Sequence, residues 1–340
     1  MTTTAMFREA AEASDVVRRQ IAENAIDAAR IGATLRAMNP RAVVTCARGS
    51  SDHAATYAKY LIESYTKTVT SSAAPSLSSV YDTTVDLRGV LFIAISQSGQ
   101  SPDLLAAVER AKQCGAFVLA LTNSSRSPLA QTADALLPLH AGPEKSVAAT
   151  KSFIASMSAI VHMLASWTQD RTLTTALMNA SEHLAQAWQC DWSAAIPALR
   201  DAVNLFVIGR GYGLGAAQEA ALKLKETCGL HAEAFSSAEV KHGPMVLVRE
   251  GFPVLMLSQS DETRTGMRTL ARDFIARNAK VFVAGFDADG APTLPTVQSH
   301  PVIEPMLMVQ SFYKFVNALA LERGLNPDTP PHLNKVTETV

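Results

Sequence analysis

The feature that most constrains the fold of this chain is an internal repeat. The segment A-R-G-S at 47–50 has a counterpart in G-R-G-Y at 209–212, and S-Q-S at 96–98 has one in S-Q-S at 258–260. The same 162 positions separate the two members of each pair. Loop motifs that recur in one register indicate a duplicated domain.

Apolar runs alternate with helical patterns in the first half, and the repeat extends to them. Short apolar runs predict strands at 42–46, 69–72, 90–95, 117–121 and 135–139. Helical spacing predicts helices at 54–65, 102–114 and 147–167. Moving 117–121 by the repeat interval gives 279–283, again an apolar run. The fold class is therefore α/β, with two tandem domains, each a flavodoxin-like three-layer sandwich with helices on both faces of a parallel sheet.

Five segments are expected along the chain. A helical segment at 1–40 ends at Pro40, and the first domain covers 41–170. A helical linker at 171–199, broken at Pro197, leads to the second domain at 200–325. The tail at 326–340 has three prolines and no apolar periodicity, so a frayed terminus is expected.

Composition excludes several classes of protein. The chain is 48% hydrophobic and 18% charged, which predicts a sizeable core. Its net charge of -1 argues against nucleic acid as a partner. The N-terminus lacks an apolar core of signal-peptide length, and the longest apolar segment, 154–167, is too short to span a bilayer. A cytoplasmic protein that does not bind membranes is expected.

The cysteines do not indicate a metal or disulfide framework. Cys46, Cys114, Cys190 and Cys228 lie far apart and form no C-x-x-C pair. They are predicted to be reduced thiols. No metal and no cofactor is expected.

The loops after two first-half strands suit an anion. The stretch 95–103, I-S-Q-S-G-Q-S-P-D, joins an apolar run to a helical pattern, and G-S-S at 49–51 does the same after the run at 42–46. Hydroxyls and backbone N–H groups at a helix N-terminus bind phosphate well, and ligands of parallel sheets bind beyond the carboxyl ends of the strands. Ordinary loops and an N-cap at Ser101 are the alternative interpretation.

Related phosphate motifs are excluded or weak, and the second copy is a poorer anion site. The chain has no P-loop pattern, and the glycines at 209–215 fit a dinucleotide fingerprint poorly. The second S-Q-S is followed by Asp261 and Glu262, which would repel a phosphate. Phosphate binding is therefore assigned to the first copy.

Three second-half features are candidates for proton transfer. Glu219, Lys223 and Glu226 share one face of the helical stretch 214–228, either as a solvated face with i, i+4 pairs or as a general base beside a lysine. His242 precedes Gly-Pro and so lies on a turn, either as a surface residue or as a group that transfers a proton to a sugar ring oxygen. Lys335 is the one candidate in the tail.

Together these motifs resemble the sugar isomerase (SIS) domain family, over about residues 41–340. Within the family they most resemble the isomerase half of glutamine–fructose-6-phosphate aminotransferases. The resemblance rests on G-S-S at 49–51, S-Q-S-G at 96–99, A-G-P-E-K-S-V-A-A-T-K-S-F at 141–153, E-A-A-L-K-L-K-E at 219–226, H-A-E-A-F at 231–235, E-V-K-H-G-P at 239–244 and L-N-K at 333–335.

The resemblance implies a role for each matching residue. The substrate phosphate would be held by Ser50, Ser51, Ser96, Gln97, Ser98 and Ser101, and the sugar by Arg48, Gly49, Val147 and Ala149. Glu226 would move a proton between C1 and C2, and Lys223 would stabilise the enolate or enolamine. His242 would open the sugar ring, acting in the site of a neighbouring subunit of a homodimer. Lys335 would reach the open-chain carbonyl.

Departures from the aminotransferase pattern set the expected function. Thr2 stands where the family's glutaminase has its cysteine, the SIS pattern begins near residue 41, and Arg48 and Gln100 differ from the usual residues. An R-G-S-S-D start is similar to that of SIS-type amino-sugar-phosphate deaminases. The expected reaction is glucosamine 6-phosphate to fructose 6-phosphate plus ammonia. Alternatives are a deglycase or isomerase acting on another amino-sugar or ketosamine phosphate, ammonia-dependent glucosamine-6-phosphate synthesis, and a non-catalytic phosphosugar-binding regulator.

Overall fold

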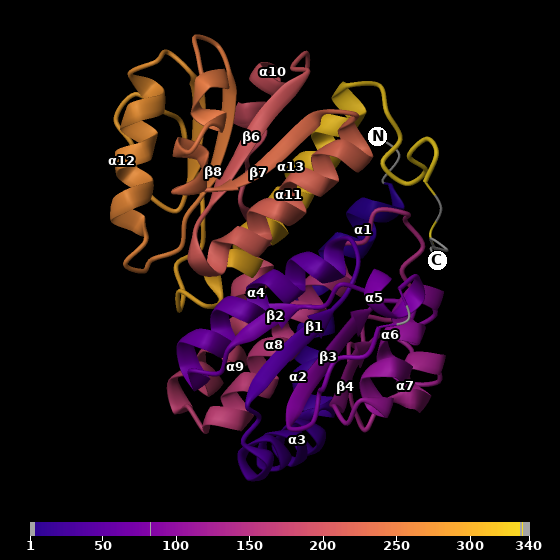
Figure 1. Cartoon of the computed structure of the whole chain (residues 1–340). Helices are drawn as coiled ribbons and strands as arrows, with labels where there is room; N and C mark the ends of the chain where they lie inside the picture. The colour runs from indigo at the N-terminus through magenta and orange to yellow at the C-terminus, as the bar shows by residue number, and fades with distance from the viewer. Residues whose placement is uncertain (1–3, 82, 334, 336–340) are drawn as a thin grey trace. The chain divides into compact units, whose positions relative to one another are not determined.

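The computed structural model describes residues 4–81, 83–333 and 335. The chain forms two compact units, and each contains one parallel sheet of five strands (Figure 1). The first-sheet unit comprises residues 15–144, 151–179 and 335, and the second-sheet unit comprises residues 4–14, 145–150 and 180–333. The units are thus interleaved in sequence, unlike the consecutive segments that we expected.

The first sheet has the strand order β2-β1-β3-β4-β5, and all its strands are parallel. The strands are β1 (Ala42–Cys46), β2 (Thr70–Ser72), β3 (Val90–Ser96), β4 (Phe117–Thr122) and β5 (Ala135–Pro138). Each predicted apolar run forms a strand whose bounds agree to within one residue. β3 is buried along its whole length, as a central strand with helices on both faces requires.

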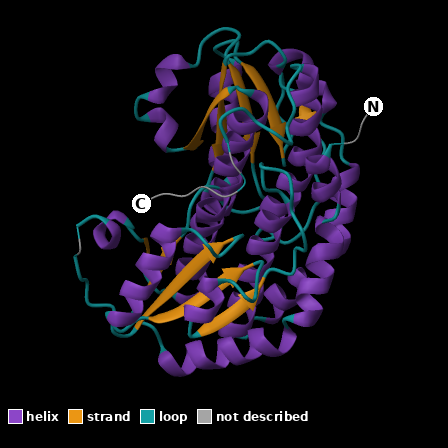
Figure 2. Ribbon diagram, turned by 90° about the vertical axis from the view of Figure 1, so that its right-hand side faces the viewer, coloured by secondary structure: helices purple, strands orange, loops and turns teal. Residues whose placement is uncertain are grey.

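Helices cover both faces of the first sheet (Figure 2). Apolar side chains of α6 (Pro102–Gln113) and α7 (Pro128–Thr132) form one core layer with β3 and β4. Against the other face lie α3 (Ala25–Met38) and α4 (Ser50–Thr66), and α8 (Lys151–Thr168) packs beside both. The other helices near this part of the chain are α2 (Ala13–Glu23) and the short α5 (Ser76–Ser79).

The second sheet repeats this topology, because its order β10-β9-β8-β6-β7 is the same sequence of strands read from the other edge. Its parallel strands are β6 (Asn204–Gly209), β7 (His231–Ser236), β8 (Pro253–Leu257), β9 (Lys280–Ala284) and β10 (Thr293–Leu294). The duplicated α/β fold is confirmed. Its strands β7 and β10 were not predicted, since neither forms a long apolar run.

Two layers of helices flank the second sheet. On one face α11 (Leu214–Cys228) lies against β6 and β7, with α13 (Glu304–Glu322) packed behind it. On the other face α12 (Arg264–Ile275) supplies apolar side chains to the core formed with β6, β8 and β9. The remaining helical segments are α1 (Ala5–Ala11), α9 (Arg171–Gln189), α10 (Ile196–Leu199) and 3-10 turns at Ser193–Ala195, Gly211–Gly213, Glu239–Lys241 and Pro244–Leu247.

Strand order determines where each unit can bind a ligand. In both sheets the order reverses between the first and third strands in sequence, that is between β1 and β3 and between β6 and β8. Such a topological switch point leaves a crevice beyond the carboxyl ends of the two strands. The repeated loop motifs occupy these positions.

Three predicted helical boundaries were wrong. The N-terminal helical pattern is interrupted at Glu12 and Asn24. The helix predicted from Val147 begins only at Lys151, because the buried Glu144 carboxylate accepts hydrogen bonds from the backbone N–H (3.2 Å) and the hydroxyl (2.6 Å) of Ser152 in its first turn. Pro197 does not break the linker helix, since α9 ends at Gln189 and Pro197 lies at the start of α10.

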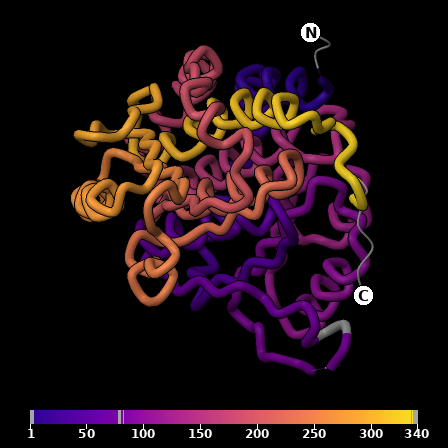
Figure 3. Tube along the Cα trace, turned by 90° about the horizontal axis from the view of Figure 1, so that it is seen from above, coloured from indigo at the N-terminus to yellow at the C-terminus, as the bar shows by residue number. Residues whose placement is uncertain are grey.

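The tail is not frayed over residues 326–333. The Asp328 carboxylate accepts hydrogen bonds from the backbone N–H groups of Ala5 and Met6, both at 2.7 Å. The Asp328 carbonyl oxygen accepts one from the N–H of Val147 at 3.3 Å. The carboxylate thereby satisfies the first N–H groups of α1, which packs against α13 (Figure 3). Of the predicted tail beyond this point, only Lys335 lies within the described residues.

Candidate functional site

The loop after β1 brings a glycine and two serines to the carboxyl edge of the first sheet. Gly49 has a left-handed φ of 54°, which allows α4 to begin directly after it at Ser50. The Gly49 carbonyl oxygen accepts hydrogen bonds from the N–H groups of Asp52 (2.9 Å) and His53 (3.3 Å). The N-terminus of α4 therefore lies at the switch point, where the positive end of the helix dipole favours an anion.

The loop after β3 is held in shape by its own hydrogen bonds. The Ser96 hydroxyl accepts from the Gly99 N–H at 3.1 Å, and the Ser98 hydroxyl accepts from the Gln100 N–H at 3.3 Å. Within the described residues, the side chains of Ser51, Gln97 and Ser101 have no hydrogen-bond partner. This edge thus offers hydroxyl and amide donors that the protein itself does not use.

An ion pair joins the two loops. The Arg48 guanidinium contacts one oxygen of Asp103, with Nε at 2.9 Å and Nη2 at 2.8 Å. Asp103 lies in the first turn of α6 and is buried, while the Arg48 side chain remains 54% exposed. Arg48 therefore fixes the loop after β1 relative to the helix after β3 and keeps a partly exposed cation at this edge.

Gly99 gives the first prediction. Its φ of 64° is left-handed, and an added Cβ would overlap the Ser127 side chain and lie 2.9 Å from Thr122 Oγ1. Gly99→Ala should therefore displace the loop and weaken phosphosugar binding by roughly tenfold or more, because a strained backbone costs about 1–3 kcal/mol. Calorimetric titration would measure this. Gly142→Ala, also at positive φ but with open space around its Cβ, is the matched control and should retain affinity.

In the second sheet, a carboxylate of the same chain occupies the corresponding loop. The Glu304 side chain accepts hydrogen bonds from the N–H (2.5 Å) and hydroxyl (2.8 Å) of Ser260 and from the N–H of Ser299 (3.1 Å). Arg264 Nη2 lies 3.9 Å from it. The repeat aligns Ser260 with Ser98. The second copy is therefore already filled.

The neighbouring polar groups of the second copy are also engaged. The Gln259 amide donates to the carbonyl oxygen of Arg210 (2.9 Å), to Asp261 (2.8 Å) and to Thr263 (3.1 Å). The Asp261 carboxylate thus serves its own loop, and Glu262 is exposed. We expected Asp261 and Glu262 to repel a phosphate from this loop. In the structure, the Glu304 carboxylate also occupies the loop.

Glu219, Lys223 and Glu226 of α11 form a largely buried network, so their interpretation as a solvated face was wrong. Lys223 Nζ lies 2.6 Å from Glu226 Oε2 and 3.3 Å from Glu219 Oε1. The side chains of Lys223 and Glu219 are 1% and 0% exposed. Tyr313 of α13 donates a 2.9 Å hydrogen bond to Glu219. No sequence pattern indicated Tyr313, whose spacing on α13 is that of a core residue.

The two carboxylates keep Lys223 charged. Burial lowers the pKa of the Lys223 amine, but the attraction of Glu219 and Glu226 outweighs burial and raises it above its ordinary value. The lysine is therefore an ammonium at neutral pH, suited to stabilising negative charge rather than to attacking a carbonyl.

Glu226 lines a cavity of about 500 Å³ in the second-sheet unit. Its side chain is 21% exposed, in contrast to the buried lysine beside it. The cavity is otherwise lined by Leu222, Lys225, Thr227 and Gly229 of the α11 region and by Leu325, Asn326, Pro330, Pro331 and Leu333 of the tail. A carboxylate that faces a cavity while a lysine orients it can act as a general base.

His242 lies on an exposed turn. It follows the 3-10 turn Glu239–Lys241 and precedes Gly243, whose φ is 130°. Within the described residues its side chain has no hydrogen-bond partner. Val246 and Leu247, just beyond it, are 80% and 53% exposed. The histidine is accessible and is flanked by apolar side chains.

The remaining predicted site residues are Lys335 and, within the segment 145–150, Val147 and Ala149. Lys335 Nζ lies 3.6 Å from Glu144 Oε2 in the first-sheet unit. Val147 and Ala149 lie on an irregular segment with bends at 146–148 and are half-buried, whereas Ser146, Ala148 and Thr150 are buried. The alternation leaves one side of this segment partly accessible, and the roles of all three predicted residues stay predictions.

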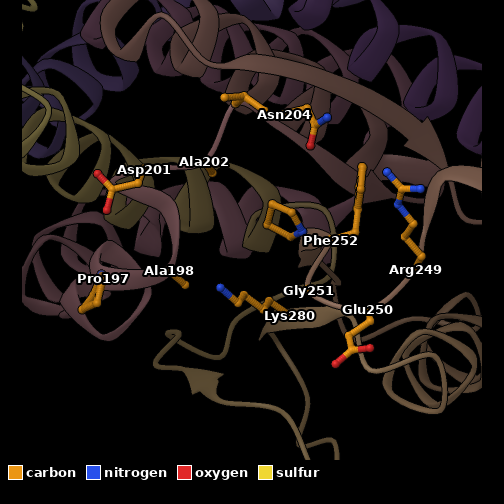
Figure 4. A pocket seen from close by; sticks show the side chains of 12 residues that line it. Pro197, Ala198, Asp201, Ala202, Asn204, Arg249, Glu250, Gly251, Phe252 and Lys280 are labelled. Atoms are coloured by element: carbon orange, nitrogen blue, oxygen red, sulfur yellow. The ribbon is translucent and has the colours of Figure 1, made fainter.

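A second cavity lies at the edge of the second sheet where its strands begin, and none of the predicted site residues lines it. Its volume is about 460 Å³, and its lining includes Asn204, Pro253 and Lys280, the first residues of β6, β8 and β9. Figure 4 shows Asp201 and Arg249 on either side of it. Because it contains none of the residues proposed to act on the substrate, this cavity is not assigned to the candidate catalytic site.

The two buried thiols, Cys46 and Cys228, are not candidates for nucleophiles. Burial raises the pKa of Cys46 to about 12 and that of Cys228 to about 11. Within the described part of the chain, no group of three His, Cys, Asp or Glu side chains could hold a metal ion, and no helix is long and apolar enough to cross a membrane.

Known proteins share this sequence and architecture. A glutamine–fructose-6-phosphate aminotransferase (isomerizing) of Leifsonia xyli is 31% identical over 360 residues, covering 97% of this chain and 58% of that protein. The chain thus spans about half the length of the curated relatives it matches. A Silicibacter pomeroyi structure, provisionally assigned as a phosphosugar isomerase, is 44% identical with a TM-score of 0.92 and covers 96% of this chain and 100% of that one.

A third comparison concerns the fold alone. A glucosamine-6-phosphate deaminase of Thermotoga maritima is 21% identical, with a TM-score of 0.79, covering 99% of this chain and 100% of that one. The SIS domain model matches residues 38–166 and 198–286, which hold both sheets up to β9 and their switch-point loops. Since the matches cover more than half of the sequence, the chain belongs to the SIS domain family.

Proposed function

We propose that this protein is an enzyme that rearranges a phosphorylated sugar, with the loops of the first sheet as its phosphate site. The observation that carries the proposal is the contrast between the two copies of the repeat. Donors at Ser51, Gln97 and Ser101 have no partner within the described residues, whereas the matching loop of the second sheet is filled by Glu304. Hydroxyls, an amide and helix N-termini are sufficient to bind a phosphate.

The phosphate ligands proposed are Ser50, Ser51, Ser96, Gln97, Ser98 and Ser101. Arg48, Gly49, Val147 and Ala149 are proposed to contact the sugar. Binding the phosphate far from the reacting carbons supplies energy that orients the substrate. This assignment predicts that binding of the substrate depends on its phosphate group.

The buried network of α11 supports proton transfer between adjacent carbons. In the proposed reaction His242 assists ring opening, and Glu226 removes the C2 proton of the open-chain aldose. The C2 electron pair forms an enolamine or enediol, and the Lys223 ammonium stabilises its negative charge. A proton is then delivered to C1. Lys335 is proposed to interact with the open-chain carbonyl.

The finer proposal is deamination of glucosamine 6-phosphate. Protonation of the enolamine at C1 gives a ketimine at C2, and water adds to this carbon to release ammonia and leave fructose 6-phosphate. The similarity to enzymes named for fructose 6-phosphate supports this substrate class. The alternatives remain a deglycase or isomerase for a related phosphosugar, ammonia-dependent synthesis, and a non-catalytic phosphosugar sensor.

A substrate panel tests the proposal. Purified protein would be incubated with amino-sugar, ketosamine and simple sugar phosphates, and both ammonia and ketose phosphate would be measured. We expect equimolar ammonia and fructose 6-phosphate from glucosamine 6-phosphate, and no turnover of glucosamine. Ketose without ammonia from another aldose phosphate would favour simple isomerisation. If every phosphosugar bound without turnover, the sensor interpretation would replace ours.

We further propose a homodimer in which His242 acts in the partner's site, because the histidine is exposed beside Val246 and Leu247. Glu226→Gln and His242→Asn should each be inactive alone. After mixed refolding, activity should return to as much as about one quarter of that of the unmodified dimer, because half of the random dimers are hybrids with one intact site. Failure to regain activity, with hybrids demonstrated by differential tagging, would place both residues in one subunit's site.

A further inference from the structure

We infer that the switch-point loop of the second sheet is a latent anion site, which Glu304 of the same chain fills with its own carboxylate. Removing that side chain should open a site for a small oxyanion such as formate or phosphate. This inference does not depend on the proposed reaction, because it concerns the copy of the repeat that carries no proposed substrate contact.

The contacts of Glu304 are those of a bound oxyanion. One carboxylate oxygen accepts from the Ser260 backbone N–H, and the other accepts from the Ser260 hydroxyl and the Ser299 N–H. Arg264 Nη2 lies 3.9 Å from the first oxygen. The side chain is only 7% exposed. Two backbone donors, one hydroxyl and one cation converge on a group shielded from water, which is the donor set that binds small anions.

The location matches the phosphate loop of the first sheet. Ser258 follows β8 as Ser96 ends β3, and Ser260 aligns with Ser98 at the repeat interval. β8 and β3 are the middle strands of their sheets. The two copies of the repeat therefore place these loops at the same position in the fold, and they differ in what occupies that position.

The loops of the second copy have adapted to a permanent occupant. Asp261 replaces the glycine that follows S-Q-S in the first copy, and its carboxylate accepts hydrogen bonds from Gln259 (2.8 Å) and from the Thr263 N–H (3.0 Å). Gln259 is 0% exposed and also bonds to the carbonyl oxygen of Arg210. These neighbouring side chains are thus bonded to one another and to the loop backbone.

The test is chemical rescue of Glu304→Ala. Truncation leaves the Ser260 and Ser299 donors without their acceptor and removes the carboxylate beside Arg264, so the melting temperature should fall by roughly 5 °C or more. Formate carries the missing carboxylate and is small enough to enter. Increasing formate should raise the melting temperature of this variant saturably and recover at least about half of the loss, compared with chloride at matched ionic strength.

Two comparisons separate a specific site from general salt effects. The unmodified protein and Glu304→Gln should not respond to formate beyond the chloride control, because the site is still filled by the longer side chain. Glu322→Ala, which removes an exposed carboxylate from the same helix, should neither lose comparable stability nor gain from formate.

The inference would be overturned if a folded Glu304→Ala protein showed no gain over chloride, or if formate stabilised Glu304→Gln equally. If the alanine variant does not fold in chloride, it would be refolded with and without formate. Folding that is no better with formate would equally overturn the inference. Since the readout is thermal stability, its outcome is independent of whether the protein turns over any sugar phosphate.

Discussion

Glu226→Gln is expected to lower kcat by about 10²–10⁴-fold, the usual contribution of a general base, while phosphosugar affinity changes little. Glutamine preserves the shape of the side chain and can still contact Lys223, but it cannot accept the C2 proton. The proposed phosphate ligands lie in the first-sheet unit and are unchanged. Steady-state kinetics and calorimetric titration with the substrate would separate the two effects.

The control is Glu322→Gln, an equal change at an exposed site on α13, which should leave kcat unchanged. Retained turnover in Glu226→Gln would assign the proton transfer to another group. Loss of both turnover and binding, with the melting temperature unchanged, would mean that Glu226 positions the substrate rather than transferring its proton.

Lys223→Met should produce the second large effect, a loss of about 3–5 kcal/mol in the free energy of unfolding. Methionine fills a similar volume, but the fully buried Glu219 carboxylate loses the ion pair with Lys223, while the Tyr313 hydroxyl still donates to it. Thermal and denaturant unfolding would measure the loss. Glu219→Gln combined with Lys223→Met should recover part of it, because the buried charge is then removed as well.

The pH dependence follows from the same network. The raised pKa of Lys223 contributes stability that is fully present below the ordinary lysine value of 10.5 and is lost as the pH rises above it. In Lys223→Met the buried Glu219 has lost its neighbouring ammonium and should bind a proton more readily in the folded state, so this variant should gain stability relative to the unmodified protein as the pH falls. Equal loss at all pH values would show that packing, rather than charge, dominates.

The repeated α/β architecture could be predicted from the sequence because its signals are local. Each strand of the first sheet is an apolar run, and the repeat interval carried that assignment into the second half. β7 and β10 were missed because β7 is not a buried apolar run, with His231 and Glu233 exposed, and β10 has two residues. The early start predicted for α8 failed because Glu144, a residue outside the helix, determines where it begins.

The candidate site was predictable only in part. Hydroxyl-rich loops after β1 and β3 are visible in the sequence, and parallel topology places both at one edge. Burial of the α11 network was not visible, since an i, i+4 spacing is the same on a solvated and a buried face. Tyr313 and Glu304 were missed because each reaches its partner across a distance in sequence that no local pattern encodes. The Arg48–Asp103 pair is of the same kind.

The central claim is that this chain moves a proton between C1 and C2 of a sugar phosphate through Glu226. Proton NMR of glucosamine 6-phosphate with the enzyme in D₂O tests it most directly. We predict that the fructose 6-phosphate formed carries deuterium at C1, because the proton taken from C2 exchanges with solvent on the base, and that Glu226→Gln forms no such product. Fructose 6-phosphate with only protium at C1 would indicate direct hydride transfer from C2 and would contradict the mechanism.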